Sequence, residues 1–467
     1  MTAPLDIVRE VLGAERAWLV GGAVRDELLG RPLDDLDVAL DGDVAAAAKA
    51  LRKRTGGAAF PLSEAFGGWR VVGPQHAWHV DVLPLLGGDL QADLAARDFT
   101  INAMARPVGG GDLVDPHGGA ADLAARRLRT VAPRALTADP LRTLRAVRLA
   151  TELGLTIEAA TLDAVRANAH GLAGVAPERT FAELKRVVGA RRPGDAVRLM
   201  QDAGVTAHVL PELLELRGIE QNVFHHRDVY DHTLEVLDAV AALQDDPAGA
   251  GLGEEGPAVA AALAEPLADE LARWGAMRFA ALLHDIAKPA TRGELADGRV
   301  TFIGHDQVGA RMARAILGRW RASGRLADHV AALTEHHLRL GFLVHERPLT
   351  RRSVYRYLTA TAPRAVDVTV FTVADRLATR GRNAETAIDA HLVLARAMLA
   401  EARAFSPRPP LVRGDQLARE LGLRPGPRLG ELLARLEEDR FAGELATPED
   451  ALARARELLA ASGSGGR

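Results

Sequence analysis

The chain has no cysteine among its 467 residues, and aromatic side chains make up only 4% of it. Without cysteine, disulfide bonds, thiolate nucleophiles and zinc-thiolate sites are excluded. No apolar run approaches the ~20 residues that a membrane-spanning helix needs. The first twelve residues also lack the basic and apolar regions of a signal peptide. These absences predict a cytoplasmic protein that has no membrane partner.

The chain also lacks an excess of basic residues, because its net charge is −4. It is therefore not a basic nucleic-acid binder as a whole, and any such surface has to be local. Between Arg134 and Arg198 there are 11 Lys and Arg against 7 Asp and Glu, which is a local excess of four positive charges. This contrast indicates a basic middle region, and an ordinary solvated helix face is the alternative.

Composition and length predict the fold class. Alanine, leucine, arginine and glycine dominate the sequence, and this mixture favours helices. A chain of 467 residues is long enough for two to four domains. Strand-like segments concentrate in the first 110 residues, so we expect a mostly helical α+β protein with one small mixed sheet near the N-terminus.

The strongest functional signal is a short stretch in which an apolar run leads into Gly21 and Gly22. Arg25 follows on a predicted short helix, and a second predicted strand carries Asp35 and Asp37. Because side chains alternate along a strand, these two carboxylates point the same way and repel each other unless a cation lies between them. The bare amides of a glycine turn can approach a phosphate, to which Arg25 adds positive charge. Each feature alone is ordinary, but together they predict a site for a nucleoside triphosphate and Mg²⁺.

These residues resemble a known family. The pattern G-G-x-V-R-D followed by D-x-D is similar to the signature of the bacterial tRNA nucleotidyltransferase and poly(A) polymerase family, which has a polymerase-beta-like head. The segment from Arg97 to Met104 resembles the family's second motif, R-R-D-F-T-I-N-A, through Arg97, Asp98 and Asn102. Arginine neutralises triphosphate charge and asparagine can hydrogen-bond a sugar hydroxyl, so both suit a nucleotide pocket. One position departs from the motif, because its first arginine is Ala96 here.

A third carboxylate is a further candidate for the metal site. Alternation along the strand expected at residues 78–82 places His79 and Asp81 on one face. Asp81 is then a candidate ligand beside Asp35 and Asp37, and an exposed strand acid is the equal alternative.

The segment after this strand departs more from the family. Only 15 residues, 82–96, separate Asp81 from Arg97, and they contain Gly87 and Gly88 but no lysine or arginine. The resemblance implies a longer flexible loop at this place, which in the family takes part in the change from C to A addition. Its shortening puts the addition of the final A in doubt.

The helix expected at residues 138–158 resembles the family's neck helix with the motif E-D-x-x-R. Asp139 and Arg142 lie at i and i+3, so we expect them to share a helix face. The resemblance implies that these two side chains read the Watson-Crick edge of C or A, so that the protein acts as the template. The glutamate of the motif is Ala138 here, and a surface ion pair between Asp139 and Arg142 is the alternative.

Further basic residues belong to this neck. Arg145 and Arg148 continue the ridge of Arg142, and the resemblance implies contacts with the triphosphate for Arg145 and with tRNA for Arg148. The pair Glu178 and Arg179 lies in a second helix, which we expect to brace the base-reading helix.

Histidine-rich helices begin near residue 216. Their order of His, His-Asp, His, His and Asp resembles that of the HD phosphohydrolase superfamily. His305 and the adjacent His336 and His337 provide the later histidines of this order. Imidazole and carboxylate suit a divalent ion that lowers the pKa of a bound water, and the kind of ion stays open. Lys288 lies one turn beyond the His-Asp pair and is a candidate for holding a phosphate. The resemblance implies four metal ligands: His232, His284, Asp285 and Asp375.

This second domain leaves alternatives open. The resemblance implies a phosphohydrolase or phosphodiesterase side activity on 2′,3′-cyclic or 3′-phosphorylated tRNA ends, or a domain that kept its fold and little activity. The Ala/Gly/Pro-rich stretch at residues 244–270 reads as a mobile insertion. In the C-terminal helices Arg413, Arg424 and Arg428 are candidates for contacts with an RNA backbone.

The sequence thus predicts four parts. We expect a nucleotidyltransferase head at 1–135, an RNA-binding neck at 136–215, an HD domain at 216–400 and an RNA-binding helical tail at 401–467. The predicted enzyme adds C, with A as a second nucleotide, from CTP and ATP to the 3′ end of tRNA without a template. The alternatives are a poly(A) polymerase, an HD phosphohydrolase with a nucleotide-sensing head, and a protein that only recognises tRNA ends.

Overall fold

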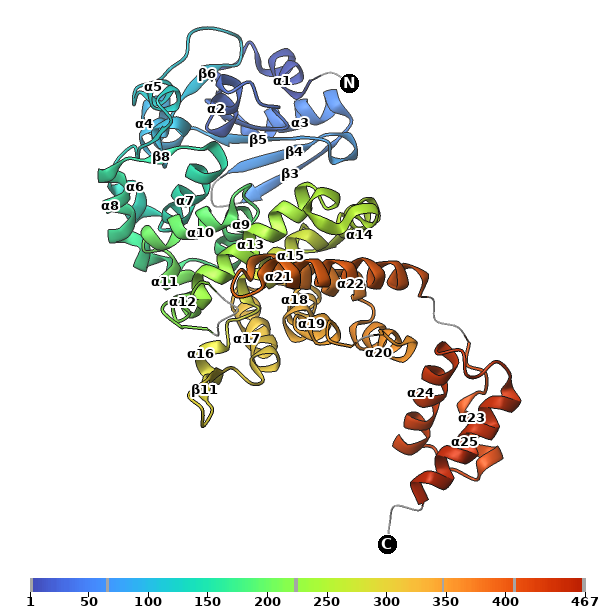
Figure 1. Ribbon diagram of the computed structural model, residues 1–467. Coiled ribbons are helices and arrows are strands. Elements are labelled where there is room, and N and C mark those ends of the chain that lie inside the picture. The colour runs from blue at the N-terminus through green and yellow to red at the C-terminus, as the bar shows by residue number, and fades with distance from the viewer. Residues whose placement is uncertain (1–2, 64–66, 222–225, 347, 406–408, 464–467) are drawn as a thin grey trace. The chain divides into compact units, whose positions relative to one another are not determined.

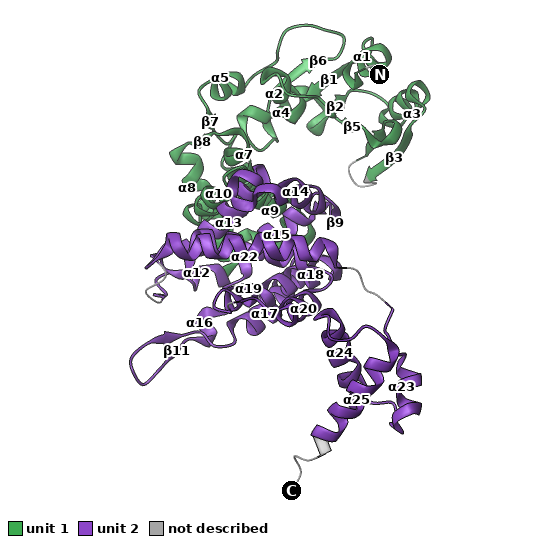
Figure 2. Cartoon of the chain, turned by 45° about the vertical axis from the view of Figure 1, so that its right-hand side comes forward, with its two compact units in different colours: residues 1–211 green, residues 212–467 purple. Residues whose placement is uncertain are grey.

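We describe the protein from a computed structural model, and the description applies to residues 3–63, 67–221, 226–346, 348–405 and 409–463. The chain forms two compact units, residues 1–211 and 212–467 (Figure 2). The four-part division predicted from the sequence is finer than this and remains a prediction.

Unit 1 contains a six-stranded sheet, shown in blue in Figure 1. Strands β2 and β5 are parallel, whereas all other neighbours in this sheet are antiparallel. The small mixed sheet expected near the N-terminus is therefore confirmed. Its strands, from one edge to the other, are β3 (Ala58–Ser63), β4 (Gly68–Val72), β5 (His79–Pro84), β2 (Asp35–Leu40), β1 (Ala17–Val20) and β6 (Ala105–Pro107).

Both faces of the sheet are covered by apolar side chains. Helices α1 (Pro4–Leu12) and α3 (Val44–Thr55) pack on one face, where Leu51 is buried with Val71 and Val80. The short helix α4 (Leu90–Ala95) places Leu94 against Val20 on the other face. The sheet is thus fixed between two layers, so that the ends of β1 and β2 have a defined place.

The remainder of unit 1 is helical. Helices α7 and α9 pack against each other, and the short parallel strands β7 (Arg127–Leu128) and β8 (Thr156–Ile157) pair beside them. The remaining helices of this unit are α2 (Gly22–Leu28), α5 (Gly119–Ala124), α6 (Arg134–Ala138), α7 (Leu141–Leu153), α8 (Ala159–Asn168), α9 (Pro177–Val188), α10 (Pro193–Asp202) and α11 (Thr206–Val209).

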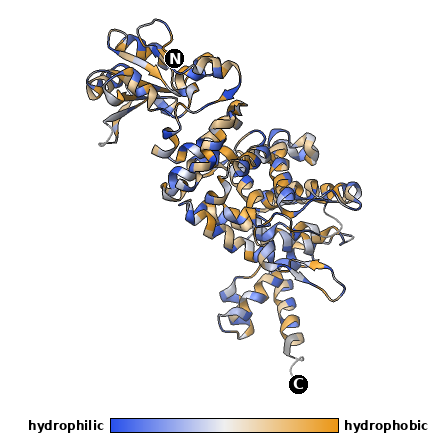
Figure 3. Ribbon diagram, turned by 90° about the vertical axis from the view of Figure 1, so that its left-hand side faces the viewer, coloured by the Kyte–Doolittle hydropathy of each residue, from blue (hydrophilic) through white to orange (hydrophobic). Residues whose placement is uncertain are grey.

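Unit 2 is built almost wholly of helices, which carry mixed hydrophobic and hydrophilic residues (Figure 3). Two small hairpins interrupt them, β9 (Pro266–Ala268) with β10 (Leu271–Ala272) and β11 (Gly293–Glu294) with β12 (Val300–Thr301). The helices are α12 (Pro211–Leu214) at the boundary, α13 (Val229–Asp245), α14 (Gly256–Leu263), α15 (Arg273–Leu283), α16 (Lys288–Thr291), α17 (His305–Arg319), α18 (Gly324–His336), α19 (Arg339–Leu343), α20 (Arg351–Thr361), α21 (Ala365–Ala378), α22 (Ala384–Ala404), α23 (Gly414–Leu421), α24 (Pro427–Phe441) and α25 (Pro448–Gly463).

The stretch at residues 244–270 is not the mobile insertion that its composition suggested. Leu252, Val259 and Leu263 are buried there, and the stretch forms helical turns and helix α14. An added Cβ at Gly256 would lie 2.8 Å from the Cβ of Ala248, so small residues are needed for close packing. The small side chains from which we expected mobility therefore allow tight packing.

The last three helices, α23 to α25, have a hydrophobic cluster of their own. Helix α24 contacts α20, where Arg352 pairs with Asp439 and the Arg351 guanidinium lies 4.3 Å from the centre of the Phe441 ring. Across the described residues, no helix is both long and apolar enough to cross a membrane.

Candidate functional site

Gly21 lies between strand β1 and helix α2 in a conformation that other residues avoid, with φ of 69°. A Cβ added at Gly21 would lie 2.7 Å from Nη1 of Arg97 and 3.1 Å from Oδ2 of Asp37. The backbone therefore approaches two functional side chains more closely than an L residue allows. Gly22 follows as the first residue of α2.

Asp35 and Asp37 lie on β2 at the same side of the sheet, as predicted. The side chain of Asp35 is 75% exposed and accepts an ion-pair contact from Nδ1 of His79 at 2.8 Å. Burial raises the pKa of Asp37, while the nearby Arg97 acts to lower it and the Asp81 carboxylate adds to the rise. A half-buried carboxylate beside a second carboxylate fits a site for a divalent cation, because oxygen ligands suit Mg²⁺ and its charge would offset the cost of desolvation.

Asp81 does lie beside Asp37, because the two residues are paired in the parallel register of β2 and β5. Both oxygens of Asp81, however, accept hydrogen bonds from Arg70 at 2.7 Å. The third carboxylate is therefore already neutralised, and we expect it to shape the field around Asp37 rather than to bind the ion directly.

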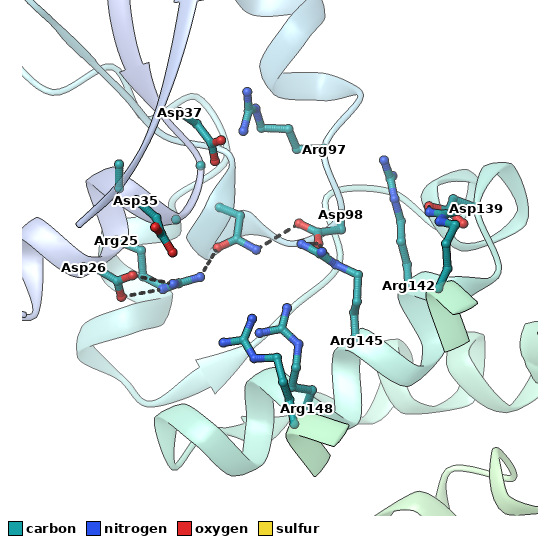
Figure 4. A pocket seen from close by; sticks show the side chains of 16 residues that line it. Arg25, Asp26, Asp35, Asp37, Arg97, Asp98, Asp139, Arg142, Arg145 and Arg148 are labelled. Atoms are coloured by element: carbon teal, nitrogen blue, oxygen red, sulfur yellow. Dashed lines mark hydrogen bonds and ion pairs between the residues drawn. The ribbon is translucent and has the colours of Figure 1, made fainter. Parts of the chain in front are cut away.

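A chain of hydrogen bonds links the two motifs across the site (Figure 4). Arg25 donates to both oxygens of Asp26 at 3.0 and 2.7 Å and to Oδ1 of Asn102 at 2.7 Å. Asn102 donates in turn to Oδ1 of Asp98 at 3.0 Å, and Oδ2 of Asp98 accepts from Nε of Arg145 at 3.0 Å. Burial alone would raise the pKa of Asp98, but Arg145 and Asn102 outweigh it and lower that pKa. Asp98 therefore orients the other residues from a buried position.

Arg97 directly follows the short segment, residues 82–96, that lies where the family resemblance implies a longer loop. Its guanidinium donates to Oδ2 of Asp93 at 2.9 and 3.0 Å, and the other oxygen of Asp93 accepts from the backbone N–H of Leu86 at 3.3 Å. Leu94 beside it is buried. Residues 82–96 thus form a turn and helix α4, tied to the site by Asp93.

The pair predicted to read the base, Asp139 and Arg142, has a different geometry from the one expected. Asp139 is not on a helix, because it lies in extended backbone between α6 and α7, and helix α7 starts only at Leu141. Asp139 accepts a hydrogen bond at 2.8 Å from Arg179, which confirms that helix α9 braces this region. Arg142 donates to two backbone carbonyl groups, so the ion pair between Asp139 and Arg142 is not formed.

The RNA contact predicted for Arg148 is not supported by its position in the structure. Only 4% of it is exposed, and its guanidinium donates to Glu183 and, at 2.9 Å, to Glu152. A guanidinium that is buried between two carboxylates is not free for an RNA phosphate. Arg424 and Arg428, by contrast, lie exposed around the start of α24, and Arg413 pairs with Asp415 at 3.1 Å.

The residues of the predicted nucleotide site line one cleft of about 460 Å³ within unit 1. Figure 4 shows Asp35 and Asp37 toward one end of it and Asp139 and Arg142 toward the other. Every residue predicted for the nucleotide site is part of the lining, apart from Asp81. The lining also contains residues that the sequence reasoning did not assign to the nucleotide: Ala23, Asp26, Arg179 and Arg186. Seven arginines face five aspartates in this cleft, so it suits a polyanionic ligand that brings cations.

The second site lies in unit 2, where the predicted ligands do meet. Nε2 of His232 on α13 lies 3.1 Å from Oδ1 of Asp375 on α21. Nε2 of His284, at the end of α15, lies 3.1 Å from Oδ2 of Asp285. Lys288 Nζ lies 2.7 Å from the same oxygen and 2.6 Å from Oε1 of Gln221. The ligand types and their burial fit a divalent metal ion.

Two further residues belong to this cluster, although we did not assign them as ligands. His305 at the start of α17 and His337 after α18 place their Nε2 atoms 3.3 Å apart, beside Asp285. Burial lowers the pKa of His337 to about 4, and His284 adds to this decrease, so the ring is neutral at physiological pH. The order of histidines in the sequence already contained both residues, whereas their convergence depends on the packing of five helices.

Comparison with known proteins assigns the two regions that hold these residues to known domain families. A model described as the poly A polymerase head domain matches residues 17–82 and 71–129, and the HD domain model matches residues 229–380. The A-adding tRNA nucleotidyltransferase of Deinococcus radiodurans is 38% identical over 448 residues, which are 94% of either chain. The chain belongs to the bacterial tRNA nucleotidyltransferase and poly(A) polymerase family. It is accordingly a nucleotidyltransferase, and its two sites match the two metal-dependent domain families.

Further proteins are similar to this chain in sequence or in fold. The CC-adding tRNA nucleotidyltransferase of Thermus thermophilus is 34% identical and aligns with 94% of this chain and 92% of its own. A solved Bacillus stearothermophilus CCA-adding enzyme in complex with CTP has a TM-score of 0.67 at 21% identity, and covers 99% of this chain and all of its own. A Thermotoga maritima CCA-adding enzyme complexed with tRNA has a TM-score of 0.61 at 19% identity, over 97% of this chain and 94% of that one.

Proposed function

We propose that the protein adds C residues from CTP to the 3′ end of tRNA without a nucleic-acid template, and that addition stops at CC. The observation that carries this proposal is the cleft of unit 1, which holds a carboxylate pair at one end and the Asp139 and Arg142 pair at the other. Relatives named for A addition and for CC addition each align with 94% of the chain, so the choice between them depends on local structure.

Asp35 and Asp37 lie at the end of the cleft to which we assign the reaction. We assign Asp35 and Asp37 to hold Mg²⁺, which when bound would lower the pKa of the tRNA 3′-hydroxyl and neutralise the triphosphate. Gly21 and Gly22 allow the backbone to approach the phosphates. Arg25 and Arg97 supply donors that stabilise the negative charge as the α-phosphorus is attacked and pyrophosphate leaves.

The opposite end of the cleft selects the base. A carboxylate accepts from the exocyclic amine of cytosine, and a guanidinium donates to its ring nitrogen and carbonyl oxygen. Asp139 and Arg142 supply these two groups, and both are held by neighbours rather than by each other. Their unshared hydrogen-bonding positions are therefore open to a nucleobase.

The segment at residues 82–96 supports an end product of CC. Leu94 is buried, and Asp93 bonds both Leu86 and Arg97, so this segment is part of the packed head. A site whose adjoining loop is short and fixed has no segment to rearrange when the base changes from C to A. The resemblance to the family implies that such a rearrangement is needed for A addition.

An assay with defined tRNA ends tests this function. Purified protein is given tRNAs that end before C, at C and at CC, with CTP or ATP offered separately, and the products are resolved at single-nucleotide length. We expect two C residues to be added and ATP to be rejected. Addition of A to the CC end would show that the short segment does not limit the enzyme, and long products with ATP alone would identify a poly(A) polymerase.

We also propose a phosphohydrolase activity in unit 2, because its buried histidine and aspartate cluster resembles a hydrolytic metal site. Lys288 beside the cluster would hold the phosphate. Phosphate release that persists in the variant His284→Ala would refute this assignment without affecting the proposal for unit 1.

A further inference from the structure

One face of the sheet in unit 1 carries a row of side chains that extends from the carboxylate pair to the edge of the sheet. The strand registers place Asp37 beside Asp81, Asp81 beside Arg70, and Arg70 beside Phe60. Residues that are paired across neighbouring strands point to the same side of a sheet. The row therefore crosses three strand spacings of about 4.8 Å each and ends on the edge strand β3.

The outer end of this row is open to solvent. Phe60 is 44% exposed, and the side chain of Arg70 is 35% exposed. Helix α3 packs against β3, β4 and β5 from the opposite face, where Val71 is buried. Helix α4 covers the face of the row only near β1, through the contact of Leu94 with Val20. The part of this face that belongs to β3 and β4 (labelled in Figure 1) is thus available to a ligand.

Arg70 is fixed in place and still has donors to offer. Its Nε and Nη2 donate to the two oxygens of Asp81 at 2.7 Å. A guanidinium carries five N–H donors, so three remain without a partner among the described residues. The hydrogen bond to Asp81 raises the pKa of Arg70, so its charge is permanent. A charged, preoriented guanidinium with unused donors suits a phosphate.

Phe60 adds an aromatic surface next to this charge. Among the exposed large hydrophobic residues of the described chain, two are aromatic, and Phe60 is the one that lies in unit 1. An exposed ring beside a basic residue on a sheet is a platform on which the bases of single-stranded nucleic acids stack. The two neighbours therefore suit a nucleic-acid strand better than a protein or a lipid.

The direction of the reaction decides which strand lies there. The residues assigned to the triphosphate lie on the β1 side of Asp37, because a Cβ added at Gly21 would lie 3.1 Å from Oδ2 of Asp37. In phosphoryl transfer the attacking and leaving oxygens are roughly in line, so the hydroxyl group approaches from the side opposite to the pyrophosphate. That side of Asp37 is the β5 side, where the row of Asp81, Arg70 and Phe60 begins.

We propose that this row is the binding site for the 3′ end of the acceptor RNA. Arg70 binds the phosphate that joins the last two nucleotides, and the base of the penultimate nucleotide stacks on Phe60. The order of the strand, with its terminal hydroxyl first, then a phosphate and then a base, follows the order of Asp37, Arg70 and Phe60. The inference rests on the proposed nucleotide addition to an RNA 3′ end, and it does not depend on whether addition stops at CC.

The place of the penultimate base can be followed by fluorescence. The full chain is titrated, without nucleotide or divalent metal, into an RNA hairpin that ends in two unpaired nucleotides, with 2-aminopurine as the penultimate base. Stacking on a ring quenches this fluorophore. We expect quenching with the unsubstituted protein and with Phe60→Trp, but none with Phe60→Leu, which keeps an apolar side chain without the ring. Equal quenching with Phe60→Leu and the unsubstituted protein would overturn the proposal.

The same titration has two controls. Leu28→Ala, at an equally exposed apolar residue on α2, should quench like the unsubstituted protein. With 2-aminopurine moved to the terminal position, Phe60→Leu and the unsubstituted protein should give equal signals. A loss of quenching at both positions would show a general loss of RNA binding, and would contradict the stacking of one particular base.

The phosphate contact is tested by the salt dependence of RNA binding. Arg70→Gln is combined with Asp81→Asn, so that no unpaired carboxylate is left in the row. The slope of log affinity against log salt concentration should fall by about 0.7, the value for one phosphate of a single strand. Arg52→Gln, at an exposed arginine of α3, should leave the slope unchanged. Equal slopes in the two variants would refute the role of Arg70.

Steady-state incorporation separates this row from the nucleotide cleft. Phe60→Leu should raise the KM for the RNA by about 10-fold, the size expected for one stacked base, while the KM for CTP stays the same. A rise in the KM for CTP instead would assign the row to the incoming nucleotide and overturn the proposal. An RNA hairpin that does not bind the protein at all would refute the proposed function itself, whereas binding that is insensitive to Phe60 and Arg70 refutes only this site.

Discussion

The two candidate metal sites of this protein differ in their ligands and in their surroundings. The site of unit 1 places carboxylates on a strand and surrounds them with arginines in a cleft of about 460 Å³. The site of unit 2 places four buried histidines, the buried Asp285 and the half-buried Asp375 among helices. Oxygen ligands suit Mg²⁺, which usually arrives with a nucleotide, whereas imidazoles retain a transition metal by themselves.

The difference extends to how each site keeps its residues in place. In unit 1, Arg25, Asn102, Asp98 and Arg145 hold one another through side-chain hydrogen bonds. In unit 2 the rings of the histidines are fixed mainly by backbone carbonyl groups. We therefore expect the first site to adapt to its substrate and the second to be preformed.

The largest effect should come from removing one carboxylate of unit 1. Asp37→Ala should reduce nucleotide incorporation by at least about 10³-fold, because the charge that holds the cation is lost. Single-turnover incorporation of labelled CTP measures this, and Asp41→Ala, just beyond the same strand, serves as control. The metal content of unit 2 should stay unchanged, and its loss would show that the two sites are not independent.

A substitution in unit 2 should have the opposite effect: the site of unit 2 loses its activity, and CTP incorporation is retained. His232→Ala should remove bound transition metal and lower phosphate-ester hydrolysis by about 10²-fold or more. CTP incorporation should stay within about twofold, since none of the described residues of unit 2 lines the cleft. Metal analysis and both activity assays check this, with the exposed His345→Ala as control. A parallel loss of incorporation would contradict the separation.

A smaller effect concerns the choice of base. Arg142→Ala should reduce the discrimination between CTP and UTP by about 10- to 100-fold, because one well-placed bidentate contact contributes about 1–3 kcal/mol. The ratio of kcat/KM for the two nucleotides measures it. Arg134→Ala, an exposed arginine on α6, should leave the ratio unchanged. Equal slowing with both nucleotides would assign Arg142 to phosphate binding instead.

The smallest effect is predicted for the brace of Asp139. Arg179 is 54% exposed, so its ion pair contributes little energy by itself. Arg179→Ala should lower the same discrimination by only about threefold by freeing Asp139, with little change in thermal unfolding. Arg192→Ala is the control, since Arg192 pairs with Asp195 outside the cleft. A loss of stability without a change in discrimination would contradict a positioning role.

The parts that could be predicted from the sequence are local ones. Alternation along β2 placed Asp35 and Asp37, and the Gly21 turn was identified from its own residues. What could not be predicted depends on distant partners, such as the hydrogen bond from Arg179 to Asp139 or the neutralisation of Asp81 by Arg70.

Two errors arose because composition or local spacing was given too much weight. Spacing alone placed Asp139 on a helix, but Pro140 lies next to it and disfavours helical backbone at that position. The stretch at 244–270 was expected to be a mobile insertion, although Val259 and Leu263, four residues apart, were a signal for a packed helix face.

The central claim is that Asp35 and Asp37 hold the metal while Asp139 and Arg142 read cytosine. A crystal structure of the protein with tRNA ending before C, a non-hydrolysable CTP analogue and Mn²⁺ tests it most directly. The account predicts anomalous density beside Asp35 and Asp37, with the cytosine edge within hydrogen-bonding distance of Asp139 and Arg142. A triphosphate bound without metal at these carboxylates, or a base that faces away from both residues, would contradict it.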